Sequence, residues 1–174
     1  MKILTSRLEI RPIKFSEIEE VRVFHNDPNT LKWLSDQRII TRLQQFLWFS
    51  RLKRTNKSER WIARSLSNDE LISVIRLDQI DFENKNLLIG LDVVSKGRRQ
   101  KFATEIYESI IPYLFNNYHI NRLSMVTLED NIAAITLYKY LGFKQEGVLR
   151  QCYFRNGNFV NGLVFSLLKE ESNH

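Results

Sequence analysis

The chain has 174 residues, a hydrophobic content of 43% and a formal net charge of +6. This length and apolar content suffice for one folded domain, residues 1–174, and no apolar run reaches the roughly 18 residues that a membrane-spanning helix needs. The single cysteine, Cys152, excludes an internal disulfide and has no metal-ligand spacing around it. We therefore expect an intracellular, cytoplasmic protein without a membrane segment or a metal site.

Hydrophobic periodicity predicts alternating strands and helices along the chain, because apolar residues recur at two-residue spacing in strands and at three- and four-residue spacing in helices. In chain order we expect a strand at 8–10, helices at 16–24 and 43–52, strands at 61–65, 71–80 and 87–94, a helix at 102–115, a strand at 122–127, a helix at 132–141, and strands at 143–149 and 159–168. Pro112 should kink or shorten its helix. This mixed order indicates the α/β class.

A basic loop separates the strand at 87–94 from the helix at 102–115. Its four cations are Lys96, Arg98, Arg99 and Lys101. A strand that leads into a helix presents free backbone N–H groups and the positive end of the helix dipole at that turn. The pattern predicts a binding site for an anion such as a pyrophosphate, and a solvated basic loop is the alternative interpretation.

The helix at 132–141 has clear start and stop signals, since Asp130 can cap its beginning and Gly142 can end it in the left-handed conformation. Residues at three- and four-residue spacing form one apolar face: Ala134, Leu137, Tyr138 and Leu141. Tyr138 should therefore point into the protein. A tyrosine with a packing role alone is the alternative.

Three segments carry a resemblance to a known family. Residues 131–143, NIAAITLYKYLGF, resemble the NxxAxxLYxxxGF segment of the GNAT superfamily of acyl-CoA-dependent N-acyltransferases. The opening TSRLEIRP, residues 5–12, is similar to the TxRLxLRP start of the branch with ribosomal-protein, polyamine and nucleotide-amino-sugar acetyltransferases, and residues 119–131 form a further match. The resemblance implies a mixed, mostly antiparallel sheet that splays between its fourth and fifth strands, with helices on both faces and acetyl-CoA as the acyl donor.

The resemblance also implies roles for particular residues. Tyr138 is expected to protonate the departing thiolate, since a phenol is protonated at neutral pH and acidic enough for this task. Backbone N–H groups near 92–94 are expected to stabilise the oxyanion. The residues expected to contact the coenzyme are Asp92, Val93, Val94, Gly97, Arg98, Arg99, Gln100, Lys101, Phe102, Ala103, Thr104 and Asn131.

The chain departs from the family pattern at two positions. In the phosphate loop, R/QxxGxG/A, Arg98 and Ala103 match, but Lys101 replaces the central glycine. Leu88 stands where related branches often carry a glutamate. The general base therefore stays open among Asp78, Asp81, Asp92 and water. A GNAT-shaped protein that has lost catalysis is an alternative to an active enzyme.

The acceptor is expected to bind against the first two helices, whose sequence resembles the WRNDPxxxxW…IxxxxHxxWF region of amino-sugar N-acetyltransferases. The expected substrate-binding residues are His25, Asn26, Asp27, Trp33 and Trp48, with Gln45 in the place of the family histidine. The positive net charge suits the anion of a nucleotide-linked amino sugar. Polyamine and protein N-terminal acetylation are alternatives. Nucleic-acid binding is disfavoured because the basic residues are spread along the chain. The oligomeric state is open, with a homodimer as one alternative.

Overall fold

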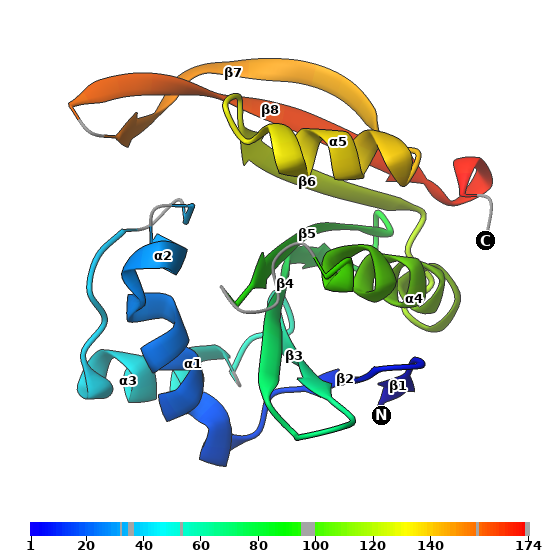
Figure 1. Ribbon diagram of the computed structural model, residues 1–174. Coiled ribbons are helices and arrows are strands. Elements are labelled where there is room, and N and C mark those ends of the chain that lie inside the picture. Colours follow the sequence, from blue (N-terminus) through cyan, green and yellow to red (C-terminus); the bar gives the residue numbers. More distant parts are fainter. Residues whose placement is uncertain (32, 35–36, 53, 95–99, 156, 173–174) are drawn as a thin grey trace.

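A computed structural model describes residues 1–31, 33–34, 37–52, 54–94, 100–155 and 157–172. The described residues form one mixed sheet of eight strands in the order β1-β2-β3-β4-β5-β6-β8-β7 (Figure 1). The strands are β1 (Ile3–Leu4), β2 (Leu8–Pro12), β3 (Glu59–Ser65), β4 (Leu71–Asp81), β5 (Asn86–Val93), β6 (Arg122–Leu128), β7 (Lys144–Arg155) and β8 (Asn158–Leu168). The helices are η1 (Phe15–Glu17), α1 (Ile18–Asn26), α2 (Pro28–Leu31), α3 (Arg42–Leu52), α4 (Phe102–Asn117), α5 (Ile132–Tyr140) and η3 (Lys169–Glu171).

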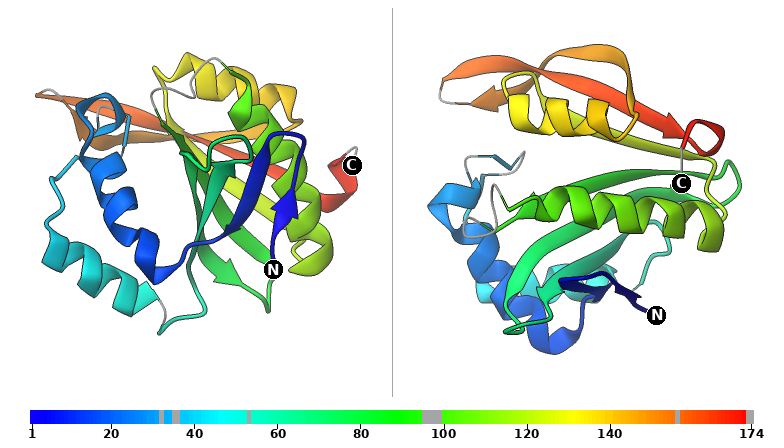
Figure 2. Two further views of the ribbon diagram at one scale, coloured as in Figure 1. Left: turned by 60° about the horizontal axis from the view of Figure 1, so that its bottom comes forward. Right: turned by 45° about the vertical axis from the view of Figure 1, so that its right-hand side comes forward.

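Helices cover both faces of the sheet, as Figures 1 and 2 show, with α1 and α3 on one side and α4 on the other. Each face has its own apolar cluster. The first joins Val21 of α1 and Phe49 of α3 to Ile62 and Val74. The second is larger and packs α4 and α5 against the opposite face of the sheet, including β6 and β8. The expected α/β class with helices on both faces is confirmed.

The sheet splays between β5 and β6. These neighbours are parallel and pair only at Asn86, Leu87 and Leu88 among the described residues. Beyond that point β5 continues beside β4, while β6 continues beside β8 as far as Leu128, which pairs with Gly162. The opening thus lies between the fourth and fifth of the strands predicted from sequence, and main-chain groups along its two walls lack a sheet partner across it.

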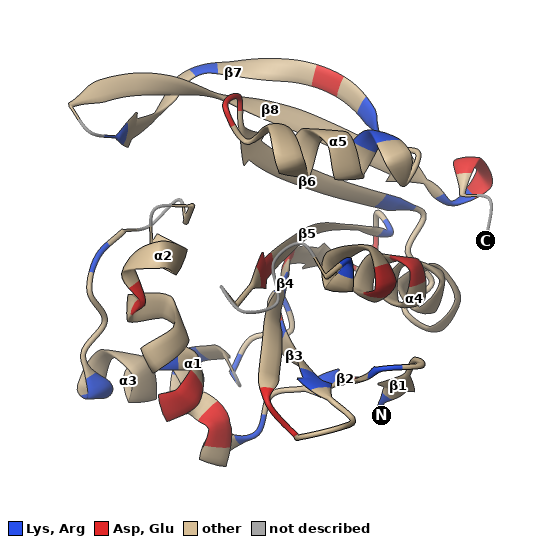
Figure 3. Cartoon of the chain, viewed as in Figure 1, with Lys and Arg blue, Asp and Glu red and all other residues tan. Residues whose placement is uncertain are grey.

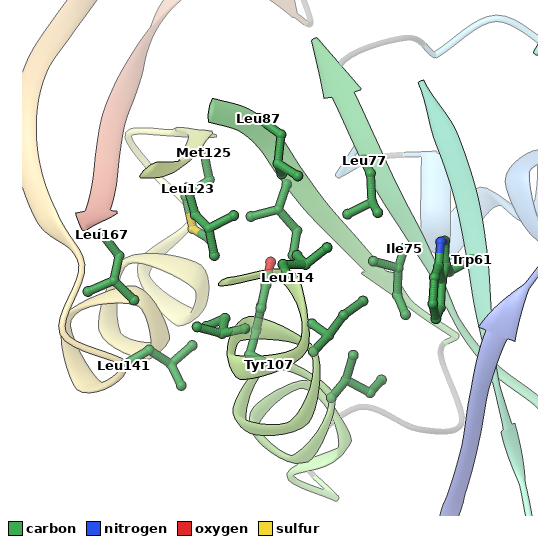
Figure 4. Packing of buried hydrophobic residues seen from close by; sticks show 14 of the residues in the cluster. Trp61, Ile75, Leu77, Leu87, Tyr107, Leu114, Leu123, Met125, Leu141 and Leu167 are labelled. Carbon is green, nitrogen blue, oxygen red and sulfur yellow. The ribbon is translucent and has the colours of Figure 1, made fainter. Parts of the chain in front are cut away.

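The core is built around α4, whose buried face meets strands on both sides of the splay (Figure 4). Tyr107 and Leu114 of this helix pack among Ile75, Leu87 and Leu123, which come from β4, β5 and β6. The helix continues through Pro112 to Asn117, so Pro112 does not shorten it, and the alternative of a kink stays a prediction. Burial of the apolar face outweighs the cost of about 3 kcal/mol for a proline inside a helix.

The closing hairpin also differs from expectation, because β7 runs to Arg155 rather than ending near Leu149. Its pairing with β8 is interrupted between Leu149 and Tyr153, and Gln151 within that bulge has a φ of 53°. A bulge breaks the two-residue alternation by which a strand is recognised in sequence, which explains the early end of the predicted strand. None of the helices in the described part of the chain is long and apolar enough to cross a membrane.

Candidate active site

The loop expected to hold the coenzyme phosphates is described only from Gln100 onward. Gly97, Arg98 and Arg99 lie outside the described residues. Lys101 is the N-cap of α4 and has φ 60° and ψ 16°, a left-handed conformation. Glycine adopts this region freely, whereas other residues lose about 1–2 kcal/mol there. The backbone at this position therefore suits the family glycine, and Lys101 occupies it under strain.

The first turn of α4 offers backbone donors. The N–H group of Glu105 bonds to the carbonyl of Lys101 at 3.1 Å, which makes it the first intrahelical donor. The N–H groups of Phe102, Ala103 and Thr104 come before it, and such groups at a helix start have no intrahelical acceptor. Together with the dipole of a 16-residue helix they form a suitable site for an anion, which fits the phosphates of a coenzyme.

The opening motif TSRL braces this turn from outside. The Nε atom of Arg7 donates to Oε2 of Glu105 at 2.7 Å, and its Nη1 donates to the carbonyl of Gln100 at 3.2 Å. Its guanidinium also lies 4.3 Å from the ring centre of Phe102. Thr5 adds a hydrogen bond from its hydroxyl to Oε1 of Glu105 at 2.5 Å. Sequence reasoning recognised the motif as a strand start but did not assign it this role, because the contacts are long-range.

Tyr138 of α5 is 8% exposed, so the prediction that it points inward is confirmed. Its ring packs edge-on against Phe165 of β8, with ring centres 5.6 Å apart, and against Tyr107 of α4 at 6.2 Å. Burial raises the pKa of Tyr138, while the Tyr107 hydroxyl and the Arg76 guanidinium lower it, and the net direction is upward. The phenol is therefore protonated at neutral pH.

Two signals at the ends of α5 behave differently. Gly142 has a φ of 87° and ends the helix as predicted. The cap at the other end is Asn131, whose side-chain oxygen accepts a hydrogen bond from the N–H group of Ala134 at 3.3 Å. The expected Asp130 cap is therefore wrong. Asn131 lies at the N-terminus of α5, and its amide NH₂ group can still donate a hydrogen bond to a ligand.

The wall of the splay formed by β5 presents main-chain groups in alternation. The N–H group of Val94 bonds to the carbonyl of Ile72 at 2.9 Å and is therefore not free to serve an oxyanion. In an antiparallel pair, residues alternate between those that bond to the partner strand and those that face away. By this register Leu91 and Val93 direct their main-chain groups away from β4, toward the opening. Leu91 was not among the residues expected from sequence.

A pocket of about 420 Å³ lies between α1, α3 and the strands β4 and β5. This volume is in the range of small-molecule sites. Two of the residues predicted for substrate, His25 and Trp48, line it, together with Asp92. The other lining residues that carry chemistry are Arg38, Gln44, Gln45, Arg51, Arg60 and Arg76.

The described lining is strongly basic, with four arginines and Asp92 as its carboxylate. Arg60 donates to Asp78 at 2.7 Å, and Nε of Arg76 lies 3.5 Å from Oδ2 of Asp92. A Cβ atom on Gly90 would lie 2.7 Å from Nη2 of Arg76, so the glycine leaves the space that this guanidinium fills. Over the described ribbon, basic and acidic positions are scattered among the elements (Figure 3).

Three of the residues predicted for substrate are not among the described residues that line the pocket. Asn26 has a structural role, because its side-chain amide forms hydrogen bonds with both the carbonyl and the N–H group of Ile40, each at 2.9 Å. Asp27 accepts a hydrogen bond from the Thr30 hydroxyl at 2.9 Å. Trp33 is 43% exposed beyond α2.

The candidate bases are separated by the structure. Asp78 is held by Arg60, as described above, and lies outside the described lining. Asp81 is the last residue of β4, where hydrogen bonds from the Asn84 side chain and backbone lower its pKa. Asp92 alone of the three lines the pocket. No group of three or more potential metal ligands was found among the described histidine, cysteine, aspartate and glutamate residues.

Comparison with known proteins agrees with this geometry. The family model described as the acetyltransferase (GNAT) domain matches residues 10–164. The uncharacterized N-acetyltransferase YoaA of Bacillus subtilis is 28% identical over 168 residues, which are 95% of each chain. The spermidine N(1)-acetyltransferase of Vibrio cholerae is 17% identical over 156 residues, 90% of each chain.

Two solved structures share the fold. The structure of spermidine N-acetyltransferase from Vibrio cholerae in complex with CoA and spermine has a TM-score of 0.90 at 17% identity and covers 96% of this chain and 98% of its own. The ribosomal L7/L12 α-N-protein acetyltransferase RimL in complex with coenzyme A has a TM-score of 0.85 at 15% identity, with 97% and 98% covered. At such identities these likenesses establish the fold.

Proposed function

The chain belongs to the acetyltransferase (GNAT) domain family and is an N-acetyltransferase that uses acetyl-CoA, and from this premise we propose that its acceptor is a primary amine that also carries an anionic group, such as a nucleotide-linked amino sugar. The observation that supports this choice is the basic pocket. Arg38, Arg51, Arg60 and Arg76 line it against Asp92. A low-dielectric pocket of one charge sign attracts ligands of the opposite sign.

Asp92 offers a place for the amine within this pocket. An acceptor could direct its ammonium group to the carboxylate and its phosphate or carboxylate to the surrounding guanidinium groups. Arginine suits such anions because its planar fork matches two oxygens at once. Trp48 adds an apolar ring surface on which a sugar or a base can stack, and it already packs 6.0 Å from the guanidinium of Arg60.

In the proposed reaction the amine nitrogen attacks the thioester carbon and the carbon–sulfur bond breaks. Main-chain N–H groups on the splayed part of β5, at Leu91 and Val93, would stabilise the oxyanion in this reaction. Tyr138 gives its proton to the sulfur, so the coenzyme leaves as a thiol. The surplus proton on the new amide nitrogen passes to Asp92 or to water, and solvent restores the proton of Tyr138.

Polyamine acetylation is the second candidate, and the likeness in sequence and in fold to spermidine acetyltransferase of Vibrio cholerae favours it. A polyamine would bring several positive charges to the same arginines. Like charges that meet in a pocket lower affinity, and Asp92 alone among the described lining carboxylates would offset them. For this reason the charge of the pocket favours an anionic acceptor over a polycation.

An amine panel with acetyl-CoA tests the proposal. We expect nucleotide-linked amino sugars to be acetylated and spermidine to be a poor acceptor. Arg51→Gln removes one pocket cation and should raise the KM for an anionic acceptor about tenfold. Arg54→Gln removes the same charge from the turn after α3, outside the described lining, and should leave that KM unchanged. Efficient acetylation of spermidine, with nucleotide amino sugars untouched, would replace the first candidate with the second.

A further inference from the structure

Tyr107 is a buried phenol for which the proposed reaction has no role so far. It lies in the middle of α4 and is 1% exposed. Figure 4 shows its side chain rising from the helix toward the sheet, with the hydroxyl among buried apolar side chains. An aliphatic residue would fill this position in a purely apolar core, so the hydroxyl calls for an explanation.

The Tyr107 hydroxyl has no hydrogen-bond partner among the described residues. A buried hydroxyl without a partner costs about 1–3 kcal/mol. This group is therefore retained at a cost to stability, and buried polar groups of this kind point to a partner that is absent from the free protein or that forms during a reaction.

Tyr107 lies directly beside Tyr138, the residue proposed to protonate the thiolate. The two rings pack edge-on, with their centres 6.2 Å apart. The charged groups that act on both phenols are the Arg76 guanidinium from β4 and the Asp92 carboxylate from β5. The aromatic side chains packed on Tyr138 from the segment after α5 and from β8 are Phe143 and Phe165, which carry no charge. The two hydroxyls thus share one electrostatic environment.

We propose that Tyr107 is a positioning residue for acyl transfer, whose hydroxyl donates a hydrogen bond to the Tyr138 oxygen as that oxygen gives up its proton. This inference rests on the proposed role of Tyr138. The neutral phenol of Tyr138 is a weak hydrogen-bond acceptor for the Tyr107 hydroxyl. Its phenolate is a strong acceptor in surroundings from which water is excluded.

The proton balance is that of the proposed reaction. The proton of Tyr138 moves to the thiolate sulfur, and the charge appears on the Tyr138 oxygen. Tyr107 keeps its own proton and shares it in a hydrogen bond, while the guanidinium of Arg76 supplies a permanent positive charge nearby. Burial raises the pKa of Tyr107 well above its ordinary value, so this phenol stays a donor throughout the working pH range.

Tyr107→Phe tests the inference, because it deletes the hydroxyl and keeps the ring. A hydrogen bond to the phenolate lowers the pKa of Tyr138, so its loss should raise that pKa and make Tyr138 a weaker acid. We expect kcat to fall about tenfold and the alkaline limb of the pH profile of kcat to move to higher pH. The thermal midpoint should stay the same or rise, since the deleted hydroxyl had no partner.

Tyr113→Phe is the matched control on the same helix. The Tyr113 ring packs on Trp61, 5.6 Å between centres, and is not in contact with Tyr138 in any described ring pair. It should change neither kcat nor the pH profile. In a Tyr138→Phe background, Tyr107→Phe should have no further effect on turnover.

The outcomes separate the two proposals. If Tyr138→Phe retains full turnover, the acid assigned under the proposed function is wrong. If Tyr138→Phe is slow but Tyr107→Phe matches the wild type in kcat and in pH profile, the acid stands and the inference about Tyr107 is overturned. A fall in kcat with an unmoved pH profile would also overturn it, because it would indicate a packing role.

Discussion

Arg7 and Glu105, which are 98 positions apart in sequence, are joined by a charge-assisted hydrogen bond of 2.7 Å from Nε to Oε2. The bond connects the turn between β1 and β2 to the first turn of α4. The side chain of Glu105 is 16% exposed and that of Arg7 is 45% exposed, so solvent screens this contact in part. The chain start therefore holds the helix end at which the coenzyme phosphates are expected.

The first prediction concerns the acid stability of this contact. Burial acts to raise the pKa of Glu105, but hydrogen bonds from Thr5 and Arg7 outweigh it, and the pKa lies below its ordinary value of 4.5. The contribution to stability is present above pH 4.5 and is lost as pH falls through the lowered value. Thermal midpoints measured from neutral pH into acid should drop less steeply for Glu105→Gln than for the wild type. Glu108→Gln, an exposed position on the same helix, should follow the wild-type slope.

The second prediction concerns Tyr138. Replacement by Phe keeps the contacts with Phe165 and Tyr107 but removes the proton donor. Turnover should fall about 10²-fold while affinity for acetyl-CoA stays within a few-fold. Steady-state kinetics and isothermal titration calorimetry measure the two quantities. Full turnover in the variant, under conditions in which chemistry limits the rate, would leave Tyr138 with a packing role alone.

The third prediction concerns the strained Lys101. Lys101→Gly relieves the left-handed conformation and should stabilise the free protein by about 1 kcal/mol. It also removes a cation from the start of α4, so acetyl-CoA should bind about threefold more weakly. Lys85→Gly is the control, because Lys85 has a φ of 55° in the turn before β5. That variant should gain similar stability with unchanged acetyl-CoA affinity, and a loss of affinity in both variants would contradict a local effect.

The fourth prediction concerns Gly90 and the arginine that crosses it. A Cβ atom there would lie 2.7 to 3.1 Å from three guanidinium atoms of Arg76. Gly90→Ala should therefore turn this flexible side chain away from Asp92 and raise the acceptor KM several-fold, with stability reduced by about 1 kcal/mol or less and acetyl-CoA affinity unchanged. Gly147→Ala, where an added Cβ meets no atom within 4 Å, should alter none of these. An unchanged KM in Gly90→Ala would show that the position of Arg76 does not govern acceptor binding.

Local sequence patterns were sufficient for much of the fold. The inward direction of Tyr138 and the Gly142 helix stop both follow from spacing along one element. Such patterns are reliable because helix and strand periodicities are set by the backbone alone. They did less well in β7, where the bulge around Gln151 interrupts the alternation and the strand runs to Arg155 instead of ending near Leu149.

The same distinction between local pattern and long-range contact applies to the candidate site. The sequence by itself determined the family, the strand-to-helix turn with its basic loop, and the tyrosine at the end of α5, because one continuous segment encodes each of them. Only the tertiary structure decided that Asn26 binds the backbone of Ile40, that Arg51 and Arg76 line one pocket with Asp92, and that Arg7 contacts the turn before α4. These relationships join residues from separate elements, and their distances depend on how helices pack on the sheet and where the sheet splays, which no single segment encodes.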